Sequence, residues 1–182
     1  MIDSDLFRKT MRQWAAGVTV ITVHGGGRVH GMTANSFTSV SCEPPLLLFC
    51  VGLTNDTHAM LTVGARVGIN LLSESQSELS KRFASKTSAR YQFDDLDFYV
   101  GPNGVTLFRH CAAVMEADVI NAYEAGDHTI FVAHILSAHP DCDRRPLVYS
   151  QGSYVEIKPA TGDVKPAARN AAPELRKKML AA

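Results

Sequence analysis

The stretch Gly31-Met32-Thr33-Ala34-Asn35-Ser36-Phe37-Thr38-Ser39-Val40-Ser41-Cys42-Glu43-Pro44-Pro45 decides how the fold of this chain is interpreted. It lies between two strongly apolar runs and is rich in small hydroxyl and amide side chains. Small donors and acceptors suit a backbone that a flat, polar ligand with a phosphate tail approaches closely. A polar edge strand has the same composition, so composition alone leaves both interpretations open.

The apolar runs on either side of this stretch predict strands. Val18 to Val23 is a β-branched run and predicts a buried strand, and Leu46 to Val51 predicts a central one. The glycines in His24-Gly25-Gly26-Gly27-Arg28 predict a turn between the first strand and the polar stretch. Pro44-Pro45 ends the polar stretch, because neither proline can donate a ladder hydrogen bond.

Two helices are predicted outside this region, in addition to a short one that starts near Thr57. Residues 4 to 16 show helical periodicity, with Ser4 as the N-cap and Gly17 as the stop. Ser73-Glu74-Ser75-Gln76 has the pattern of a capping box, and Phe83 lies on the apolar face of the helix that follows.

A long hairpin is predicted further along the chain. Its arms are Ala113–Tyr123 and His128–Ala138, and apolar residues in the first arm alternate with Glu116 and Asp118, as in a half-exposed strand. Many strands, few helices and little βαβ alternation favour a mainly β fold, an antiparallel barrel with peripheral α-helices.

Length and charge limit the protein's organisation and partners. The 182 residues, 46% of them hydrophobic, fit one domain over residues 1–157, followed by an Ala/Pro/Lys-rich tail over 158–182. Lys plus Arg equals Asp plus Glu at 18 each, which argues against a nucleic-acid or anionic-membrane surface.

Cysteine spacing and the start of the chain indicate the compartment. The four cysteines form no C-x-x-C pair, so we expect reduced thiols and neither a disulfide framework nor a metal site. The acidic first residues show no signal peptide, and no apolar run approaches the roughly 20 residues of a membrane span. These features predict a cytoplasmic protein.

Three common nucleotide-binding and hydrolase motifs are absent, and two polar features could bear on chemistry. The sequence has no G-x-G-x-x-G, no P-loop and no G-x-S-x-G elbow. His128 follows Gly126-Asp127 at a strand start, where the turn either presents the imidazole to a cleft or merely closes the hairpin. Asn55 and Thr57, near a helix start, either hold a phosphate or act as ordinary caps.

An ordered set of short motifs resembles the flavin reductase family, small NAD(P)H:flavin oxidoreductases that supply reduced flavin to two-component monooxygenases. The motifs are Phe7-Arg8, Gly17 to Thr22, Gly31 to Ser41 with Pro44-Pro45, Asn70 to Ser73, Leu79-Ser80 with Phe83-Ala84, Gly126 to Phe131, Pro146 to Tyr149 and Gly152 to Tyr154. They cover roughly residues 6 to 157. The resemblance implies a split β-barrel and a homodimer that binds FMN or FAD near its interface.

The resemblance also implies roles for individual residues. The segment along the isoalloxazine ring would be Thr33, Ala34, Asn35 and Ser36. The residues toward the ribityl chain and phosphate would be Ser39, Ser41, Cys50, Val51, Asn55 and Thr57, and those near the ribityl-phosphate or adenine end would be Phe83, Ala84 and Lys86. His128, as the catalytic residue, and Tyr154 would lie on the nicotinamide side.

The implied activity is hydride transfer from nicotinamide C4 of NADH or NADPH to flavin N5, with the reduced flavin passed to a partner monooxygenase. His128 would position the nicotinamide or donate a hydrogen bond near it, without a necessary proton transfer. The alternatives are a flavin-binding electron-transfer or redox-sensing module without turnover of free flavin, and an oxidase in a similar barrel. The sequence departs from the family pattern at Trp14-Ala15-Ala16 and over residues 101 to 112, so the flavin preference stays open.

Overall fold

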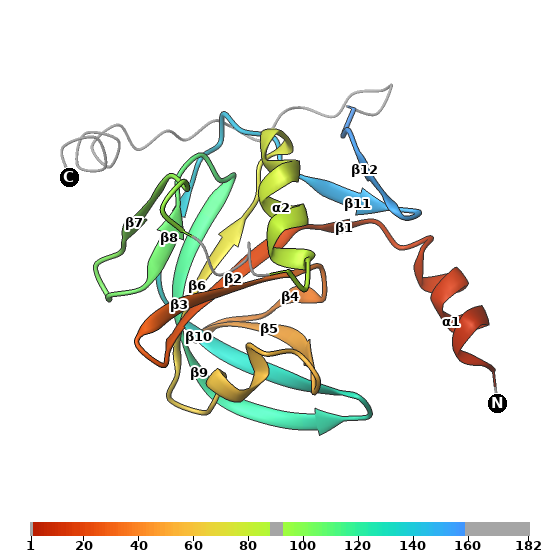
Figure 1. The fold of residues 1–182 in the computed structure, drawn as a ribbon, viewed down its shortest axis with the longest axis horizontal. Coiled ribbons are helices and arrows are strands. Elements are labelled where there is room, and N and C mark those ends of the chain that lie inside the picture. The colour runs from red at the N-terminus through yellow and green to blue at the C-terminus, as the bar shows by residue number, and fades with distance from the viewer. Residues whose placement is uncertain (1, 88–92, 159–182) are drawn as a thin grey trace.

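The computed structural model describes residues 2–87 and 93–158 and shows a mainly β fold (Figure 1). The main sheet contains β2 (Thr19–Gly25), β3 (Arg28–Ala34), β4 (Phe37–Cys42), β5 (Pro45–Gly52), β6 (Arg66–Leu71), β9 (Ala113–Ala125) and β10 (His128–Pro140). Two smaller sheets contain β1 (Ala16–Gly17), β11 (Val148–Ser150) and β12 (Ser153–Val155), and β7 (Phe98–Val100) and β8 (Thr106–Phe108). The helices are α1 (Ser4–Met11), α2 (Ser77–Ala84) and the 3-10 turns η1 (His58–Met60) and η2 (Glu74–Gln76).

The main sheet is antiparallel throughout, in the order β3-β2-β6-β9-β10-β5-β4. Its two edge strands, β3 and β4, are consecutive in the chain and are joined only by Asn35 and Ser36. The sheet must therefore curl until its edges meet. No ladder joins β3 to β4 in the described part of the chain, which is the arrangement of a split barrel. The predicted mainly β fold is confirmed.

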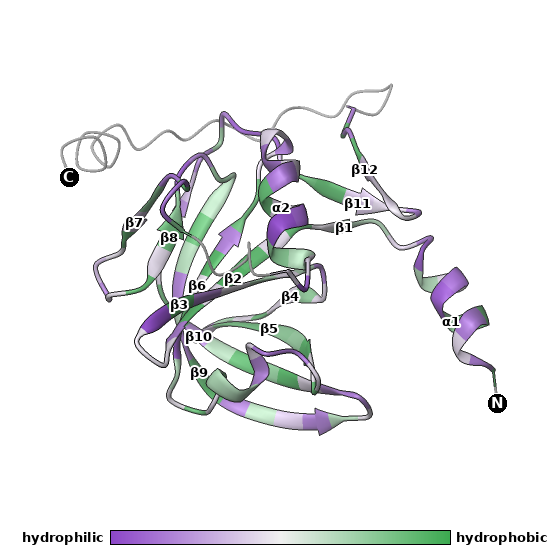
Figure 2. Ribbon diagram, viewed as in Figure 1, coloured by the Kyte–Doolittle hydropathy of each residue, from purple (hydrophilic) through white to green (hydrophobic). Residues whose placement is uncertain are grey.

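β2 is buried on both faces over Thr19 to Val23, which accounts for the unbroken β-branched run from Val18 to Val23. Ile21 and Val23 pack into one core cluster with Phe49 and Phe131 of the barrel interior. Val20 packs into a second cluster, which fills the space between the outside of the sheet, α2 and the β7–β8 pair. The hydropathy colouring shows the resulting apolar stripes on the sheet strands (Figure 2).

α2 covers the β2–β3 side of the sheet (Figure 1), and the predicted capping box stands just before it. The box is present: Ser73 N donates to Gln76 Oε1 at 3.0 Å, and η2 leads directly into α2. Phe83 is 2% exposed and lies against Gly31, where an added Cβ would come within 2.5 Å of the phenyl ring. Gly31 therefore allows α2 to sit directly on β3.

The prediction for the first helix was wrong at both ends. The N-cap is Asp3, whose Oδ1 accepts from Leu6 N at 2.7 Å, and α1 ends at Met11. Gln13 N and Trp14 N bond to carbonyl groups three residues back, a tighter turn than an α-helix. Gly17 does not stop the helix, because it already belongs to β1 and pairs with Val148 of β11.

The predicted hairpin is confirmed as β9 and β10, but Glu116 does not lie on an exposed face. Its carboxylate is fully buried and accepts hydrogen bonds from Asn103 N and Nδ2, both at 2.9 Å, and from Ser137 Oγ at 2.7 Å. Alternation failed here because the loop after β7 covers this face of β9. Asp118 is partly buried and pairs with Arg66 at 2.7 Å.

The predicted tail lies outside the described residues from position 159 onward. Over residues 2–87 and 93–158, no helix is long and apolar enough to cross a membrane.

Candidate functional site

One hollow, called the large cavity below, has a volume of about 760 Å³. It opens where the ends of β3, β5 and α2 meet the turn between β9 and β10. Its lining residues are Thr33, Gly52, Leu53, Thr54, Asn55, Asp56, Phe83, Ala84, Lys86, Asp127 and His128. Six of these were predicted as site residues and come from four separate segments: Thr33, Asn55, Phe83, Ala84, Lys86 and His128.

The β9–β10 turn presents His128 to this cavity. Gly126 has a positive φ of 66°, which a glycine adopts without strain. His128 shares a hydrogen bond of 2.7 Å between its Nδ1 and Asp127 Oδ1, and its side chain is 48% exposed. This hydrogen bond and the charge of His128 lower the pKa of the Asp127 carboxyl. The imidazole is therefore oriented by its neighbour through Nδ1, which leaves Nε2 for a ligand.

The loop from Gly52 to Thr57 is held against the same turn. Leu53 N donates to Asp127 O at 3.0 Å, and His58 Nε2 shares a hydrogen bond of 2.8 Å with Thr129 Oγ1. Asn55 Oδ1 accepts from Thr57 N at 2.9 Å, which leaves the Nδ2 group of its amide to donate to a ligand. Thr57 is only 1% exposed and is not part of the cavity lining.

The α2 side of the cavity is fixed by Ser80. Thr33 Oγ1 donates to Ser80 O at 2.7 Å, and Tyr154 OH donates to Ser80 Oγ at 2.8 Å. Tyr154 is therefore hydrogen-bonded to α2 and is not among the residues that line the large cavity, although it was predicted beside the nicotinamide. Lys86, just after α2, places an ammonium group in the cavity wall.

The remaining predicted residues lie on or beside β4 and β5. Ser36 Oγ donates to Cys50 O at 3.0 Å, which ties the β3–β4 link to β5, and burial raises the pKa of the Cys50 thiol. Ala34 and Val51 are buried in the barrel core. Ser39 is exposed, and Ser41 Oγ accepts from Glu43 N at 3.2 Å.

The β-sheet register separates the two serines of β4 from the large cavity. Ser39 pairs with Leu47, and Leu47 pairs with Ala133, whereas His128 pairs with Gly52. Ala133 and His128 are five residues apart on β10, which corresponds to about 17 Å at ~3.3 Å per residue. A ligand that touches both ends must therefore be extended.

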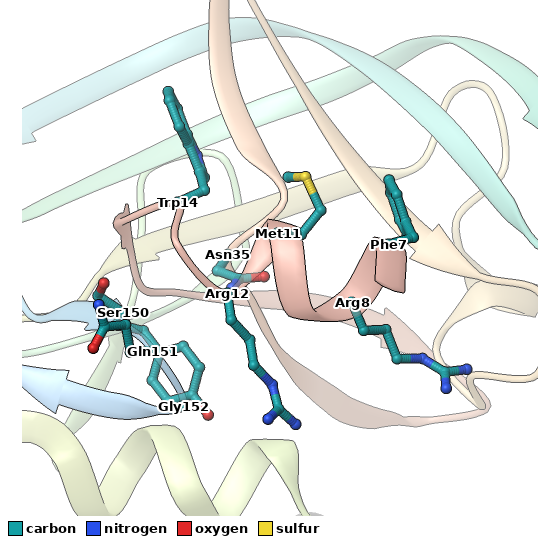
Figure 3. A pocket seen from close by; sticks show the side chains of 10 residues that line it. Phe7, Arg8, Met11, Arg12, Trp14, Asn35, Ser150, Gln151 and Gly152 are labelled. Atoms are coloured by element: carbon teal, nitrogen blue, oxygen red, sulfur yellow. The ribbon is translucent and has the colours of Figure 1, made fainter. Parts of the chain in front are cut away.

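A second hollow of about 270 Å³, called the α1 cavity below, lies between α1 and the β11–β12 turn (Figure 3). Its lining residues are Phe7, Arg8, Met11, Arg12, Trp14, Asn35, Tyr149, Ser150, Gln151 and Gly152. Asn35, predicted to lie along the flavin ring, faces this cavity, whereas Thr33 faces the large one. The β3–β4 link therefore forms part of the wall of both.

Among the described residues, no group of three or more His, Cys, Asp or Glu side chains is placed to hold a metal ion. The cavity walls instead combine hydroxyl, amide, imidazole and ammonium groups with the apolar surface of Phe83 and Leu53. That mixture suits an organic ligand with an aromatic part and a polar tail.

A family model described as a flavin reductase like domain matches residues 11–158. This chain belongs to the flavin reductase family. It is 37% identical over 155 residues to an NADH-dependent FAD reductase of Streptomyces globisporus, covering 84% of this chain and 85% of that protein. It is 36% identical over 156 residues to the reductase component of an FADH(2)-dependent resorcinol hydroxylase of a Rhizobium species, covering 85% and 87%.

A solved flavin reductase has the same fold. The NADH:FAD oxidoreductase of Streptomyces globisporus C-1027, in complex with NAD and FAD fragments, superposes with a TM-score of 0.82 at 34% identity, covering 89% of this chain and 99% of that one. The sequence resemblance to the family is thereby confirmed.

Sequence reasoning missed several residues that line the cavities of this flavin reductase. Asp127 was treated only as part of the turn, although its hydrogen bond to His128 follows from their adjacency. Thr54 and Asp56 lie in the same polar run as Asn55 and Thr57, which were predicted as site residues in their place. Arg8 and Arg12 could have been predicted to act together, since residues four apart on a helix share a face.

Proposed function

We propose that this protein is an NAD(P)H:flavin oxidoreductase that reduces FMN or FAD and supplies the reduced flavin to a partner monooxygenase. The observation that carries the proposal is the convergence of Thr33, Asn55, Lys86 and His128, from four distant segments, on one cavity of about 760 Å³. Membership of the flavin reductase family, with relatives named as NADH-dependent reductases, supports the same activity.

The large cavity fits a flavin in size and in the chemistry of its walls. Small-molecule sites typically enclose about 300–1,000 Å³ with mostly apolar walls and a few convergent polar groups. Thr33 would lie along the ring, Asn55 would bind the phosphate, and Phe83, Ala84 and Lys86 would lie toward the ribityl-phosphate or adenine end. A bound flavin supplies the redox chemistry, accepting a hydride from the reduced nicotinamide, while the protein binds and orients both molecules.

His128 is the residue that we assign to the nicotinamide. Its Nδ1 is held by Asp127 at 2.7 Å, which leaves Nε2 directed to a ligand in the cavity mouth. Gly52 faces the ring across the β5–β10 pairing, where even an added Cβ would stay 3.7 Å from Nε2. An imidazole oriented in this way can donate to or accept from a carboxamide without giving up a proton.

We further propose that the protein is a homodimer. α1 buries none of its residues, and Leu6, Phe7 and Met11 are 50%, 53% and 48% exposed, with Trp14 just beyond the helix at 71%. An apolar helix face of this kind is a typical contact surface between subunits. Analytical ultracentrifugation of the wild type and of Trp14→Glu tests this, with a dimer expected only for the wild type.

The activity is tested by the consumption of NADH or NADPH in air with added FMN or FAD. Turnover well above the background with free flavin is expected for at least one combination, and anaerobic stopped-flow then ranks the two donors and the two flavins. A protein that binds flavin tightly but gives no turnover with any combination would be an electron-transfer or sensing module instead. A yellow purified protein would hold flavin as a prosthetic group, and a colourless one would use it as a substrate.

A further inference from the structure

Two arginines on α1 face the α1 cavity together. Arg8 and Arg12 are four residues apart, and Arg12 keeps helical backbone angles at the C-cap, so both side chains leave the same side of the helix. Figure 3 shows them on the side of α1 opposite to Phe7, Met11 and Trp14. Both sides of the helix contribute to the cavity lining, and the two guanidinium groups are directed away from the three apolar side chains.

The position of Arg12 is fixed by the β11–β12 turn. Gln151 N donates to Arg12 O at 2.8 Å, and Gln151 Nε2 donates to Gln13 Oε1 at 3.1 Å. Arg8 pairs with the exposed carboxylate of Asp5 at 3.1 Å, whereas Arg12 makes no ion pair within residues 2–87 and 93–158. The cavity lining contains both guanidinium groups and no carboxylate.

The large cavity has the opposite charge balance. Its charged lining residues are Asp56, Asp127 and Lys86, two carboxylates and a single ammonium group. FMN carries one phosphate, but FAD and the nicotinamide dinucleotides each carry a diphosphate. When a flavin and a nicotinamide dinucleotide are bound together, the negative charge of their phosphates exceeds what one lysine can balance in that lining.

The two cavities are neighbours. Thr33 and Asn35, two residues apart, line one each. Arg8 is also close enough to the His128 turn for its charge to contribute, after His128 itself, to the lowered pKa of Asp127. A nucleotide that starts at His128 can therefore extend to the basic side of α1.

We propose that Arg8 and Arg12 form a binding site for the diphosphate group of a dinucleotide. The identity of the dinucleotides rests on the proposed function, and the site itself rests on the geometry of α1. A guanidinium group can donate two parallel hydrogen bonds to two oxygens of one phosphate, and it stays charged at every physiological pH. Tyr149, in the same lining, offers an aromatic face to the attached nucleoside.

The first test is equilibrium binding, which needs no turnover. Isothermal titration with ADP measures affinity for a diphosphate in the wild type, in Arg8→Gln/Arg12→Gln and in Lys9→Gln. Lys9 lies on the same helix but outside the cavity lining, so its variant removes a charge without touching the site. We expect the double variant to bind ADP at least about tenfold more weakly, since charge-assisted hydrogen bonds are lost, and Lys9→Gln to match the wild type.

The second test identifies the dinucleotide. With FMN as the flavin, the double variant should raise KM for NADH about tenfold and leave KM for reduced nicotinamide mononucleotide, which lacks the diphosphate, unchanged. A rise in the Kd for FAD, with that for FMN unchanged, would place the FAD diphosphate there instead. Circular dichroism checks that the variants are folded.

Equal ADP affinity in the double variant and the wild type overturns the proposal, as does an equal loss in Lys9→Gln. The proposed function fails by a different result, the absence of NADH or NADPH consumption by the wild type with both flavins. ADP binding by the arginines is measured independently of that outcome.

Discussion

The hydroxyl of Tyr154 donates a hydrogen bond of 2.8 Å to Oγ of Ser80, which fastens the β11–β12 hairpin to α2. The carbonyl of the same Ser80 accepts from Thr33 at 2.7 Å. Three elements that are far apart in the sequence are thus joined at one residue. The wall of the large cavity depends on this junction, since Thr33, Phe83 and Ala84 are positioned by it.

Replacing Tyr154 with Phe should lower the free energy of unfolding by about 1 kcal/mol, the usual contribution of one hydrogen bond. The aromatic contact with Tyr149, at 5.5 Å between ring centroids, is retained in this variant. Urea unfolding followed by circular dichroism measures the change, with Tyr149→Phe as the matched control. Unchanged stability together with a raised KM for NADH would show that Tyr154 acts on the nicotinamide and not on α2.

His128→Ala should raise KM for the nicotinamide substrate or slow hydride transfer, because the oriented Nε2 is lost from the cavity mouth. Flavin affinity should change little, since the predicted flavin contacts in the cavity lining lie on β3, in the loop after β5 and on or just after α2. Stopped-flow reduction and flavin titration separate the two effects. Loss of flavin binding with unaltered nicotinamide kinetics would reverse the assignment.

The same variant has an effect on the titration of Asp127. The hydrogen bond to His128 is the main cause of the lowered pKa of this carboxyl, so in His128→Ala the pKa should rise toward the ordinary value of about 3.9. Because the folded pKa is lowered, the stabilising interaction is present above the unfolded pKa and is lost as the pH falls through the folded one. Carboxyl carbon NMR titration measures this. Asp118, whose pKa is lowered mainly by Arg66, should not change and serves as the control.

Ser39→Ala with Ser41→Ala should weaken flavin binding if the flavin tail runs along β4, as the family resemblance implies. The register places these serines at least about 17 Å from His128 along the strand direction (at ~3.3 Å per residue), so the effect should exceed any effect on nicotinamide kinetics. Fluorescence titration with FMN and FAD gives the Kd values. Thr38→Ala, at the position before Ser39 on the same strand, is the control. Equal Kd values in the double variant and the wild type would remove both serines from the site.

The sequence allowed the strands, the capping box and the hairpin to be predicted, because each depends on neighbouring residues. The polar stretch was ambiguous between an edge strand and a ligand wall, and it is in fact divided between both sheet edges, with Thr33 in the cavity lining. The errors arose where distant segments meet. Gly17 pairs with β11 instead of ending α1, and Glu116 is buried beside Asn103 and Ser137.

Glu116 offers the strongest test of the packing around β9. Both oxygens of its buried carboxylate accept hydrogen bonds, Oε1 from Asn103 N and Oε2 from Asn103 Nδ2 and Ser137 Oγ. Glu116→Gln keeps the shape but turns one acceptor into a donor that faces other donors. We expect a loss of about 1–3 kcal/mol in the free energy of unfolding, the cost of leaving buried polar groups unpaired. Glu124→Gln, exposed on the same strand, should be neutral in the same urea titration. If both variants unfold at the wild-type midpoint, the buried carboxylate does not hold the loop after β7 in place.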